Sequence, residues 1–108
     1  RFTDITTAGF VKYTINSFLA MKVVFFNELF HLYNKDGGTS FDALTEIVSM
    51  DDRIGSSHLQ VPGPDGEYGF GGACFPKDTK AFVEFAKDKS PLELLDFAIG
   101  INDNMRLA

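Results

Sequence analysis

The sequence predicts an all-α fold, a helical bundle built on one long central helix and completed by a Gly/Pro-rich loop. Two observations point to it. The stretch from Phe10 to about Lys35 is rich in apolar residues and contains neither glycine nor proline, as a long helix requires. No part of the chain has the pattern of a convincing strand. We therefore expect four or five helices and no sheet.

The first helix is expected to take its cap from the threonine or the aspartate of Arg1-Phe-Thr-Asp4-Ile. The cluster Asp36-Gly37-Gly38 then ends it. Its apolar residues cover more than one stripe, which predicts burial on several sides, as in a central helix or a subunit interface. They are Phe10, Val11, Ile15, Phe18, Leu19, Val23, Phe25, Phe26, Leu29, Phe30 and Leu32.

Three shorter helices are expected after it. The second runs over residues 41–50, the third over residues 79–87, and the last begins near residue 91. The expected caps are Thr39 or Ser40 for the second helix, and Ser90 followed by Pro91 for the last. The apolar residues expected to face inward are Ala81, Phe82 and Phe85 on the third helix, and Leu92, Leu94, Leu95, Ala98, Ile99, Ile101 and Met105 on the last.

Length and composition limit the class of protein. With 108 residues, 44% of them hydrophobic, the chain suits one globular domain with its own core. A net charge of −5 without any basic run argues against nucleic acid as a partner. Polar residues interrupt the most apolar stretch, residues 10–33, so we expect no membrane span. A single cysteine makes no internal disulfide, which favours a cytoplasmic protein.

The stretch Gly69-Phe-Gly-Gly-Ala-Cys-Phe-Pro-Lys-Asp78 is the candidate active-site loop. Its glycines allow positive φ and close approach of a ligand, and Pro76 suits the first turn of a helix that starts just after Cys74. The positive end of that helix favours a thiolate, so Cys74 is a candidate nucleophile. Asp78, one turn later, can handle a proton or order a water. The alternative is a glycine-rich turn with a buried structural cysteine and an exposed Lys-Asp pair.

Lys12 and Asn16 form a second candidate constellation on the long helix. Four residues apart, they project from one face and can converge on one ligand atom. The alternative is a solvated lysine and a surface asparagine. A zinc site of His31, His58 and Cys74 is not expected, because these residues lack any metal-site spacing, and we expect no metal.

Both constellations resemble the nucleotide-sugar dehydrogenases, the UDP-glucose/GDP-mannose dehydrogenase family. The loop is similar to the family's G-Y/F-G-G-S/G-C-F/L-P-K-D pattern, and the long helix to its K-x-x-x-N-x-F/Y-L-A-x-K-I/V-x-F-x-N-E pattern. Asp51-Asp52-Arg53-Ile54-Gly55 resembles its D-x-R-I-G element. The Pro62-Gly63-Pro64 loop resembles its nucleotide-wrapping loop, with Asp65-Gly66-Glu67 as an apparent insertion.

The resemblance implies a role for each candidate residue. Cys74 would be the nucleophile and Asp78 would order the hydrolytic water, whereas Lys12 and Asn16 would stabilise the oxyanion. Arg53 would reach across a dimer interface to the sugar nucleotide of the other subunit. The remaining candidates are Tyr68, Phe70, Gly71 and Gly72 for substrate and Lys77 for cofactor. Asn27 and Glu28 are expected to be structural, and Asn102 has no expected catalytic role.

The implied reaction is the two-step, NAD-dependent oxidation of UDP-glucose to UDP-glucuronate through a cysteine thiohemiacetal and thioester, with GDP-mannose as the alternative substrate. No G-x-G-x-x-G lies between a strand and a helix, so the chain is not expected to bind NAD by itself. We expect residues 1–108 to be the central domain between two Rossmann-type domains of a larger enzyme, inactive in isolation. A homodimer through the long helix is implied, and a helical dimerisation module without chemistry is the other reading.

Overall fold

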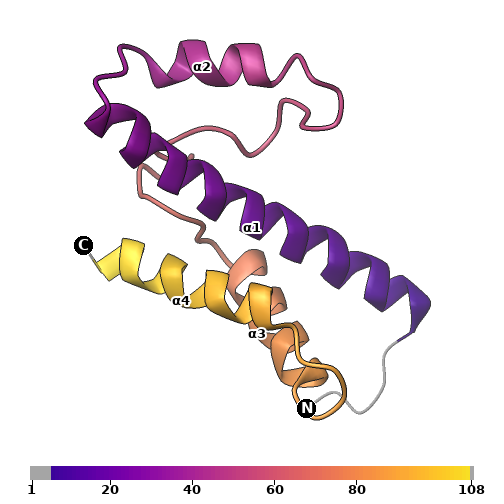
Figure 1. Ribbon diagram of the computed structural model, residues 1–108. Helices are drawn as coiled ribbons and strands as arrows, with labels where there is room; N and C mark the ends of the chain where they lie inside the picture. The colour runs from indigo at the N-terminus through magenta and orange to yellow at the C-terminus, as the bar shows by residue number, and fades with distance from the viewer. Residues whose placement is uncertain (1–5, 108) are drawn as a thin grey trace.

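Residues 6–107 are described by a computed structural model, and they form four α-helices and no strand, as the all-α prediction requires. The helices are α1 (Thr7–Lys35), α2 (Phe41–Val48), α3 (Cys74–Ala86) and α4 (Glu93–Leu107). Helix α1, with 29 residues, is the longest and contacts each of the other three. Figure 1 shows α2 on one side of α1, near its C-terminal end, and α3 and α4 on the other side.

The first two helices start at side-chain caps. Thr6 accepts a hydrogen bond from the Gly9 N–H at 3.1 Å, so it caps α1, whereas the caps expected within residues 1–5 lie outside the described residues. Ser40, not Thr39, caps α2 by accepting from the Ala43 N–H at 3.2 Å. Such bonds pair backbone donors that no helical carbonyl can reach.

The start of α3 agrees with the helix expected just after Cys74, although the third helix was expected only over residues 79–87, whereas α4 starts later than expected. Helix α3 is continuous from Cys74, so Pro76 lies in its first turn, where a missing N–H costs nothing. The prediction that Ser90 caps the last helix, with Pro91 first, was wrong by about two residues. The first helical carbonyl belongs to Leu92, which accepts from the Asp96 N–H at 3.0 Å.

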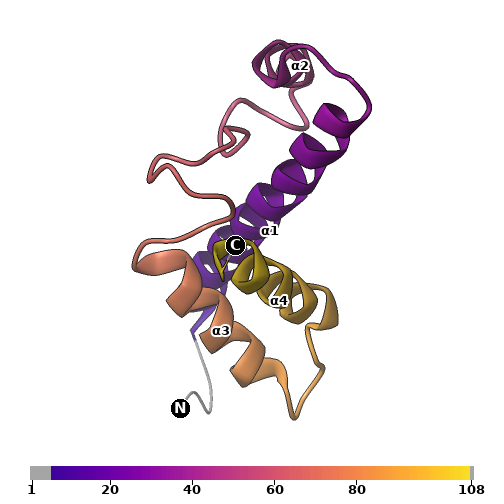
Figure 2. The same ribbon diagram turned by 90° about the vertical axis from the view of Figure 1, so that its left-hand side faces the viewer.

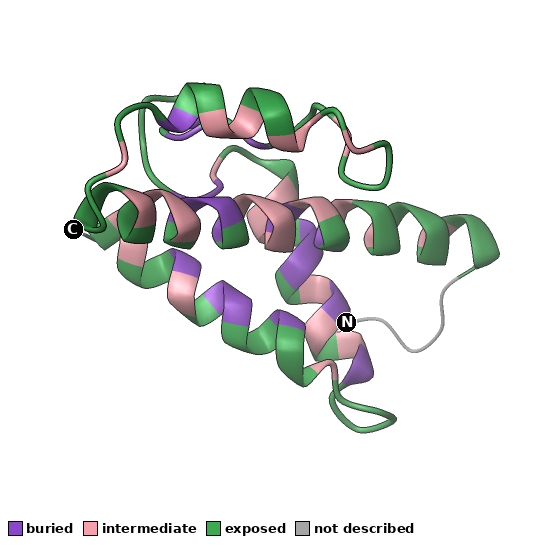
Figure 3. Ribbon diagram, turned by 45° about the horizontal axis from the view of Figure 1, so that its top comes forward, coloured by how far each residue is buried: buried purple, intermediate pink, exposed green. Residues whose placement is uncertain are grey.

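Three apolar clusters follow one another along α1. Phe82, Leu95 and Ile99 join α3 and α4 to its N-terminal half. Ala20, Val24 and Phe70 join the cysteine loop to its middle. Phe26, Phe41, Leu59 and Val61 join α2 and the segment that follows α2 to its C-terminal half. In Figure 3 the buried positions accordingly form a stripe on α1 rather than a ring around it. The other helices and the cysteine loop therefore all pack against α1.

The outer face of α1 remains exposed within this chain, so the predicted burial on several sides is not met. The face is open because only one stripe of α1 contacts the rest of the chain. Leu94 of α4, expected to face inward, is exposed as well. Together with Phe97 it continues the apolar surface of α1, whose exposed members are Phe10, Val11, Ile15, Phe18, Phe25 and Leu32.

The segment between α2 and α3, residues 49–73, has no helix or strand. It leads back from α2 past the C-terminal half of α1 to the start of α3, as the turned view in Figure 2 shows. No helix within residues 6–107 is both long enough and apolar enough to cross a membrane.

Candidate active site

Three of the predicted site residues meet between α1 and α3. The Asn16 amide donates a hydrogen bond to Asp78 Oδ2 at 2.7 Å, and Lys12 Nζ lies 3.8 Å from the same oxygen. Asp78 is only 2% exposed, whereas the Lys12 side chain is largely in solvent. Because Lys12 and Asn16 are four residues apart on α1, their two donors both reach one buried carboxylate. A solvated lysine and a surface asparagine without a shared role would not need to meet in this way.

Cys74 is the first residue of α3, and its thiol is free and exposed. A buried structural cysteine, the alternative considered for this position, is excluded. Asp78 follows one helical turn later, so both side chains project from the same side of α3. An accessible thiol at a helix start, next to a Lys–Asn–Asp cluster, is an arrangement suited to nucleophilic chemistry.

A cavity of about 400 Å³ is lined by residues close to this cysteine in sequence, although Cys74 itself does not line it. Its wall includes Gly72, two residues before Cys74, and Phe75, the residue after it. Three of the five residues predicted to bind substrate are in that wall, namely Phe70, Gly71 and Gly72. The other lining residues are Val23, His58, Gln60, Gly63, Pro64, Asp65 and Gly69. A cavity bounded by glycine backbone lets a ligand approach the main chain closely.

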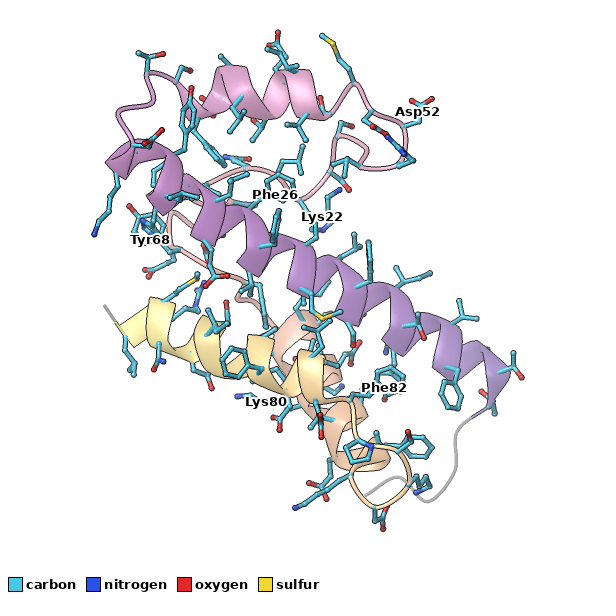
Figure 4. The ribbon with its side chains drawn as sticks, in the orientation of Figure 1. Lys22, Phe26, Asp52, Tyr68, Lys80 and Phe82 are labelled. Carbon is cyan, nitrogen blue, oxygen red and sulfur yellow. The ribbon has the colours of Figure 1, made fainter. Side chains whose placement is uncertain are left out.

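Tyr68 is not among the residues that line this cavity. Its ring stands edge-on to His31 at 4.9 Å and packs near Phe30, both on α1. Figure 4 shows Tyr68 beside the C-terminal half of α1, well removed from Phe82 on α3. Lys77 is exposed on α3 and does not line the cavity either.

Arg53 lies elsewhere, at an apolar groove of about 440 Å³ between α1 and α4. Its guanidinium makes two bonds to the Asp51 carboxylate, Nε at 3.0 Å and Nη2 at 2.6 Å, and these lower the pKa of Asp51. Lys22 holds the same turn by donating to the Ile54 carbonyl at 2.6 Å (Figure 4), and burial lowers the pKa of Lys22. Arg53 is thus solvent-exposed and lines this groove, not the cavity that contains Gly71 and Gly72.

His58 is a cavity residue for which the sequence analysis found no role. It has a positive φ of 64° and stacks on Phe75 at 5.7 Å. Partial burial, with a smaller contribution from the positive charge of Lys22, lowers its pKa below the ordinary 6.5. The neutral imidazole is therefore the favoured form at neutral pH, with an aromatic face and a polar edge at the cavity.

The Asp65-Gly66-Glu67 turn, which the resemblance suggests is an insertion, is tied to α4. Arg106 Nη2 bonds Asp65 Oδ2 at 2.7 Å, and Arg106 Nη1 donates to the Tyr68 carbonyl at 3.2 Å. Asp65 also accepts from the Glu67 N–H at 3.0 Å. Arg106 is the main cause of the lowered pKa of Asp65. These bonds hold Asp65 in the cavity wall.

Two buried asparagines, Asn27 and Asn102, bind the backbone of Gly69 and Phe70. The sequence contains a signal for this structural role, because each asparagine lies on the apolar face of its helix, where a polar residue needs an internal partner. The spacing of residues in the sequence does not show which backbone groups the two asparagines bind. Among the described residues, no group of three His, Cys, Asp or Glu side chains could hold a metal ion.

These features define a class of helical domain, in which one long helix packs against a glycine-rich loop that leads to an exposed cysteine and lines a ligand-sized cavity. The chain belongs to the UDP-glucose/GDP-mannose dehydrogenase family, as its central domain, because the sequence profile of that domain matches residues 6–104.

Individual relatives agree with the family. The chain is 43% identical over 108 residues to a UDP-glucose 6-dehydrogenase of Rhizobium meliloti (strain 1021), covering 99% of this chain and 23% of the relative. It is 39% identical over 105 residues to the UDP-glucose 6-dehydrogenase YwqF of Bacillus subtilis (strain 168), covering 96% and 22%. A 79-residue segment is 48% identical to a UDP-glucose 6-dehydrogenase of Rickettsia conorii (strain ATCC VR-613 / Malish 7), covering 73% and 17%. The chain therefore spans less than a quarter of the length of these relatives.

Proposed function

We propose that this chain is the central domain of a larger NAD-dependent dehydrogenase that oxidises UDP-glucose to UDP-glucuronate. The observation that carries the proposal is the meeting of Lys12 and Asn16 with Asp78, one turn from the exposed Cys74. The names of the relatives, all UDP-glucose 6-dehydrogenases, support the choice of substrate.

In the proposed reaction, Cys74 forms a covalent bond with the sugar. The C6 alcohol is first oxidised to an aldehyde, and the Cys74 thiolate adds to it to give a thiohemiacetal. Lys12 and Asn16 stabilise the oxygen that becomes negative in this addition, because both carry donors that point into the same space. Oxidation of the thiohemiacetal gives a thioester. Water held by Asp78 then attacks its carbonyl, which releases the carboxylate and restores the thiolate.

The two oxidations each need a hydride acceptor, which we propose is NAD⁺. The described residues contain no strand and hence no βαβ cradle, so this chain does not fit a dinucleotide by itself. Flanking domains would bind NAD⁺, with Lys77 as the contribution of this chain from the exposed side of α3. We accordingly expect the chain to be inactive in isolation.

The cavity beside Cys74 is the proposed sugar-nucleotide site. Gly71, Gly72 and the N-terminus of α3 offer backbone N–H groups where phosphate oxygens can approach. The ring of His58 provides a stacking surface for the base. Phe70 forms part of the cavity wall, and its side chain is buried against Ala20 and Val24 of α1.

A homodimer through α1 completes the proposed site. The exposed apolar groove lined by Phe18, Phe25 and Phe97 also contains Arg53. A second subunit that covers this groove would bring each Arg53 to the other subunit, where it can bind phosphate or sugar hydroxyls. The same groove supports the alternative function, a helical dimerisation module that retains no chemistry. We also propose a cytoplasmic enzyme, because an exposed catalytic thiol needs reducing surroundings.

The test is NAD⁺ reduction by the intact protein with UDP-glucose, GDP-mannose or UDP-N-acetylmannosamine. Two NADH per UDP-glucose, with loss of product in Cys74→Ser at unchanged oligomeric mass, is the expected result. Turnover with GDP-mannose alone would replace the substrate and keep the mechanism. No turnover with any of the three would leave the dimerisation module as the better account.

A further inference from the structure

The backbone at Gly69 and Phe70 is held by asparagine side chains from two helices. Asn27 on α1 accepts from the Gly69 N–H at 2.9 Å. Asn102 on α4 accepts from the Phe70 N–H at 2.6 Å and donates to the Phe70 carbonyl at 3.0 Å. Asn27 is 1% and Asn102 3% exposed. These three bonds are thus shielded from water, where a hydrogen bond is strongest and an unmade one is most costly.

Asn102 pairs with both polar groups of Phe70, as a neighbouring strand would. This segment has no sheet or helix of its own, so its buried backbone groups depend on side chains. A pair of bonds to one residue fixes the orientation of that residue as well as its position. Asn102 therefore determines how Phe70 enters the core.

Gly69 is required for this contact. Its φ is +77°, and a Cβ added there would collide with Oδ1 of Asn102. Gly66, with a similar φ of +80°, has open space around it. Gly66 thus serves only a backbone conformation, whereas Gly69 also makes room for the asparagine.

Phe70 contacts Phe75, the residue that follows Cys74. Its ring meets the ring of Phe75 edge to face at 6.2 Å, and Phe75 follows Cys74 in the chain. Both rings belong to the cluster with Ala20 and Val24 of α1. Phe70 thus packs against the first turn of α3, in which Cys74 lies.

Helix α1 binds both ends of the segment from Gly69 to Asp78. Asn16 and Asn27 are eleven residues apart, which is within about 20° of three full turns and about 16 Å along the helix, so they lie on one face. Asn16 binds Asp78 and Asn27 binds Gly69. Cys74 lies between the two attachment points, and its position against α1 is set by both.

We propose that Asn102, assisted by Asn27, is a positioning residue for Cys74, which keeps the thiol in register with Lys12 and Asn16. The inference rests on the proposed function only in taking Cys74 as the nucleophile. Asn102 would touch neither sugar nucleotide nor NAD⁺ and would act through Phe70 and Phe75.

The test compares Asn102→Ala with Asn104→Ala, a matched change at an exposed site on the same helix. Two quantities are measured in the intact protein well below its melting temperature: kcat, and the rate of Cys74 alkylation by iodoacetamide without substrate. Asn102→Ala is expected to lower kcat by about tenfold or more, as misplacement of a reacting group by about 1 Å can do. The alkylation rate should change by about threefold or more, since the surroundings of the thiol at the start of α3 are altered. Asn104→Ala should change neither.

Asn102→Asp supplies a second test in case the alanine variant folds poorly. A protonated carboxyl group can accept from the Phe70 N–H and donate to its carbonyl, as the amide does. Burial raises the pKa of such a carboxyl group, so protonation is accessible at mildly acidic pH. The kcat of Asn102→Asp relative to the unaltered protein should recover as the pH is lowered.

Two results would overturn the proposal. One is an Asn102→Ala protein that melts earlier yet keeps its kcat and alkylation rate while folded, which would make Asn102 purely structural. The other is a relative kcat of Asn102→Asp that does not depend on pH. If the unaltered protein reduces no NAD⁺, the proposed function fails, but the alkylation rates still decide whether Asn102 positions Cys74.

Discussion

Replacing Asn16 by leucine would remove the best partner of the buried Asp78 carboxylate with little change in volume. The bond between them is 2.7 Å long and ends on a side chain that is 2% exposed. A hydrogen bond to a charged group contributes about 1.5–3 kcal/mol. Lys12, at 3.8 Å and 60% exposed, is screened by solvent and adds about 1 kcal/mol or less. We therefore expect Asn16→Leu to lower the free energy of unfolding by about 2–3 kcal/mol.

A double-mutant cycle with Asp78→Asn isolates this interaction. Without the charge on residue 78, the Asn16→Leu change should cost only about 1 kcal/mol, which gives a coupling energy of about 1–2 kcal/mol. Urea unfolding followed by far-ultraviolet circular dichroism measures all four proteins. Asn34→Leu, an exposed change on the same helix, is the control and should stay within about 0.5 kcal/mol. Additive effects of Asn16→Leu and Asp78→Asn would refute the account of this cluster.

Three further predictions concern the loop, the pH dependence and the proposed dimer. Gly69→Ala should destabilise the protein by clearly more than the roughly 1–2 kcal/mol expected for Gly66→Ala in urea unfolding, because only Gly69 faces Asn102; equal losses would argue against the close approach. His58 has a lowered pKa, so its contribution to stability is complete above its ordinary 6.5 and is lost as the pH falls from there toward the lowered value. His58→Phe should flatten this slope in melting curves between about pH 5 and 7, and an unchanged slope would assign it to other groups. Phe25→Glu, a charge at a position that is 60% exposed in this chain, should shift the sedimentation mass from dimer to monomer without loss of helix; an unshifted mass would remove the groove from the interface.

Local signals in the sequence predicted most of the fold. The long helix, the Ser40 cap and the proline in the first turn of α3 each depend on residues within a few positions of one another. Helical spacing also predicted that Lys12 and Asn16 share a face, and the structure brings both to Asp78. Interactions between residues within one or two helical turns of each other could thus be predicted from the sequence.

Contacts between distant residues were not readable in the same way. Asn102 is 32 residues from Phe70, and nothing in the spacing specifies that the amide pairs with that backbone. The ring of Tyr68 faces His31 because it packs on α1. Tyr68 lies in an irregular loop, which has no regular alternation from which the direction of a side chain can be predicted. Phe25 is apolar and was therefore expected to be buried, but it is exposed because no other described part of this chain packs over it.

Trapping the acyl intermediate would test the central claim most directly. The intact protein is mixed with UDP-glucose and NAD⁺, quenched in acid during turnover and digested, and the peptide that contains Cys74 is analysed by mass spectrometry. The account predicts a UDP-glucuronyl thioester on Cys74, enriched in Asp78→Asn because its hydrolysis slows, and absent from Cys74→Ser. Formation of two NADH per UDP-glucose by a Cys74→Ser protein, without any adduct in the unaltered enzyme, would contradict covalent catalysis at this site.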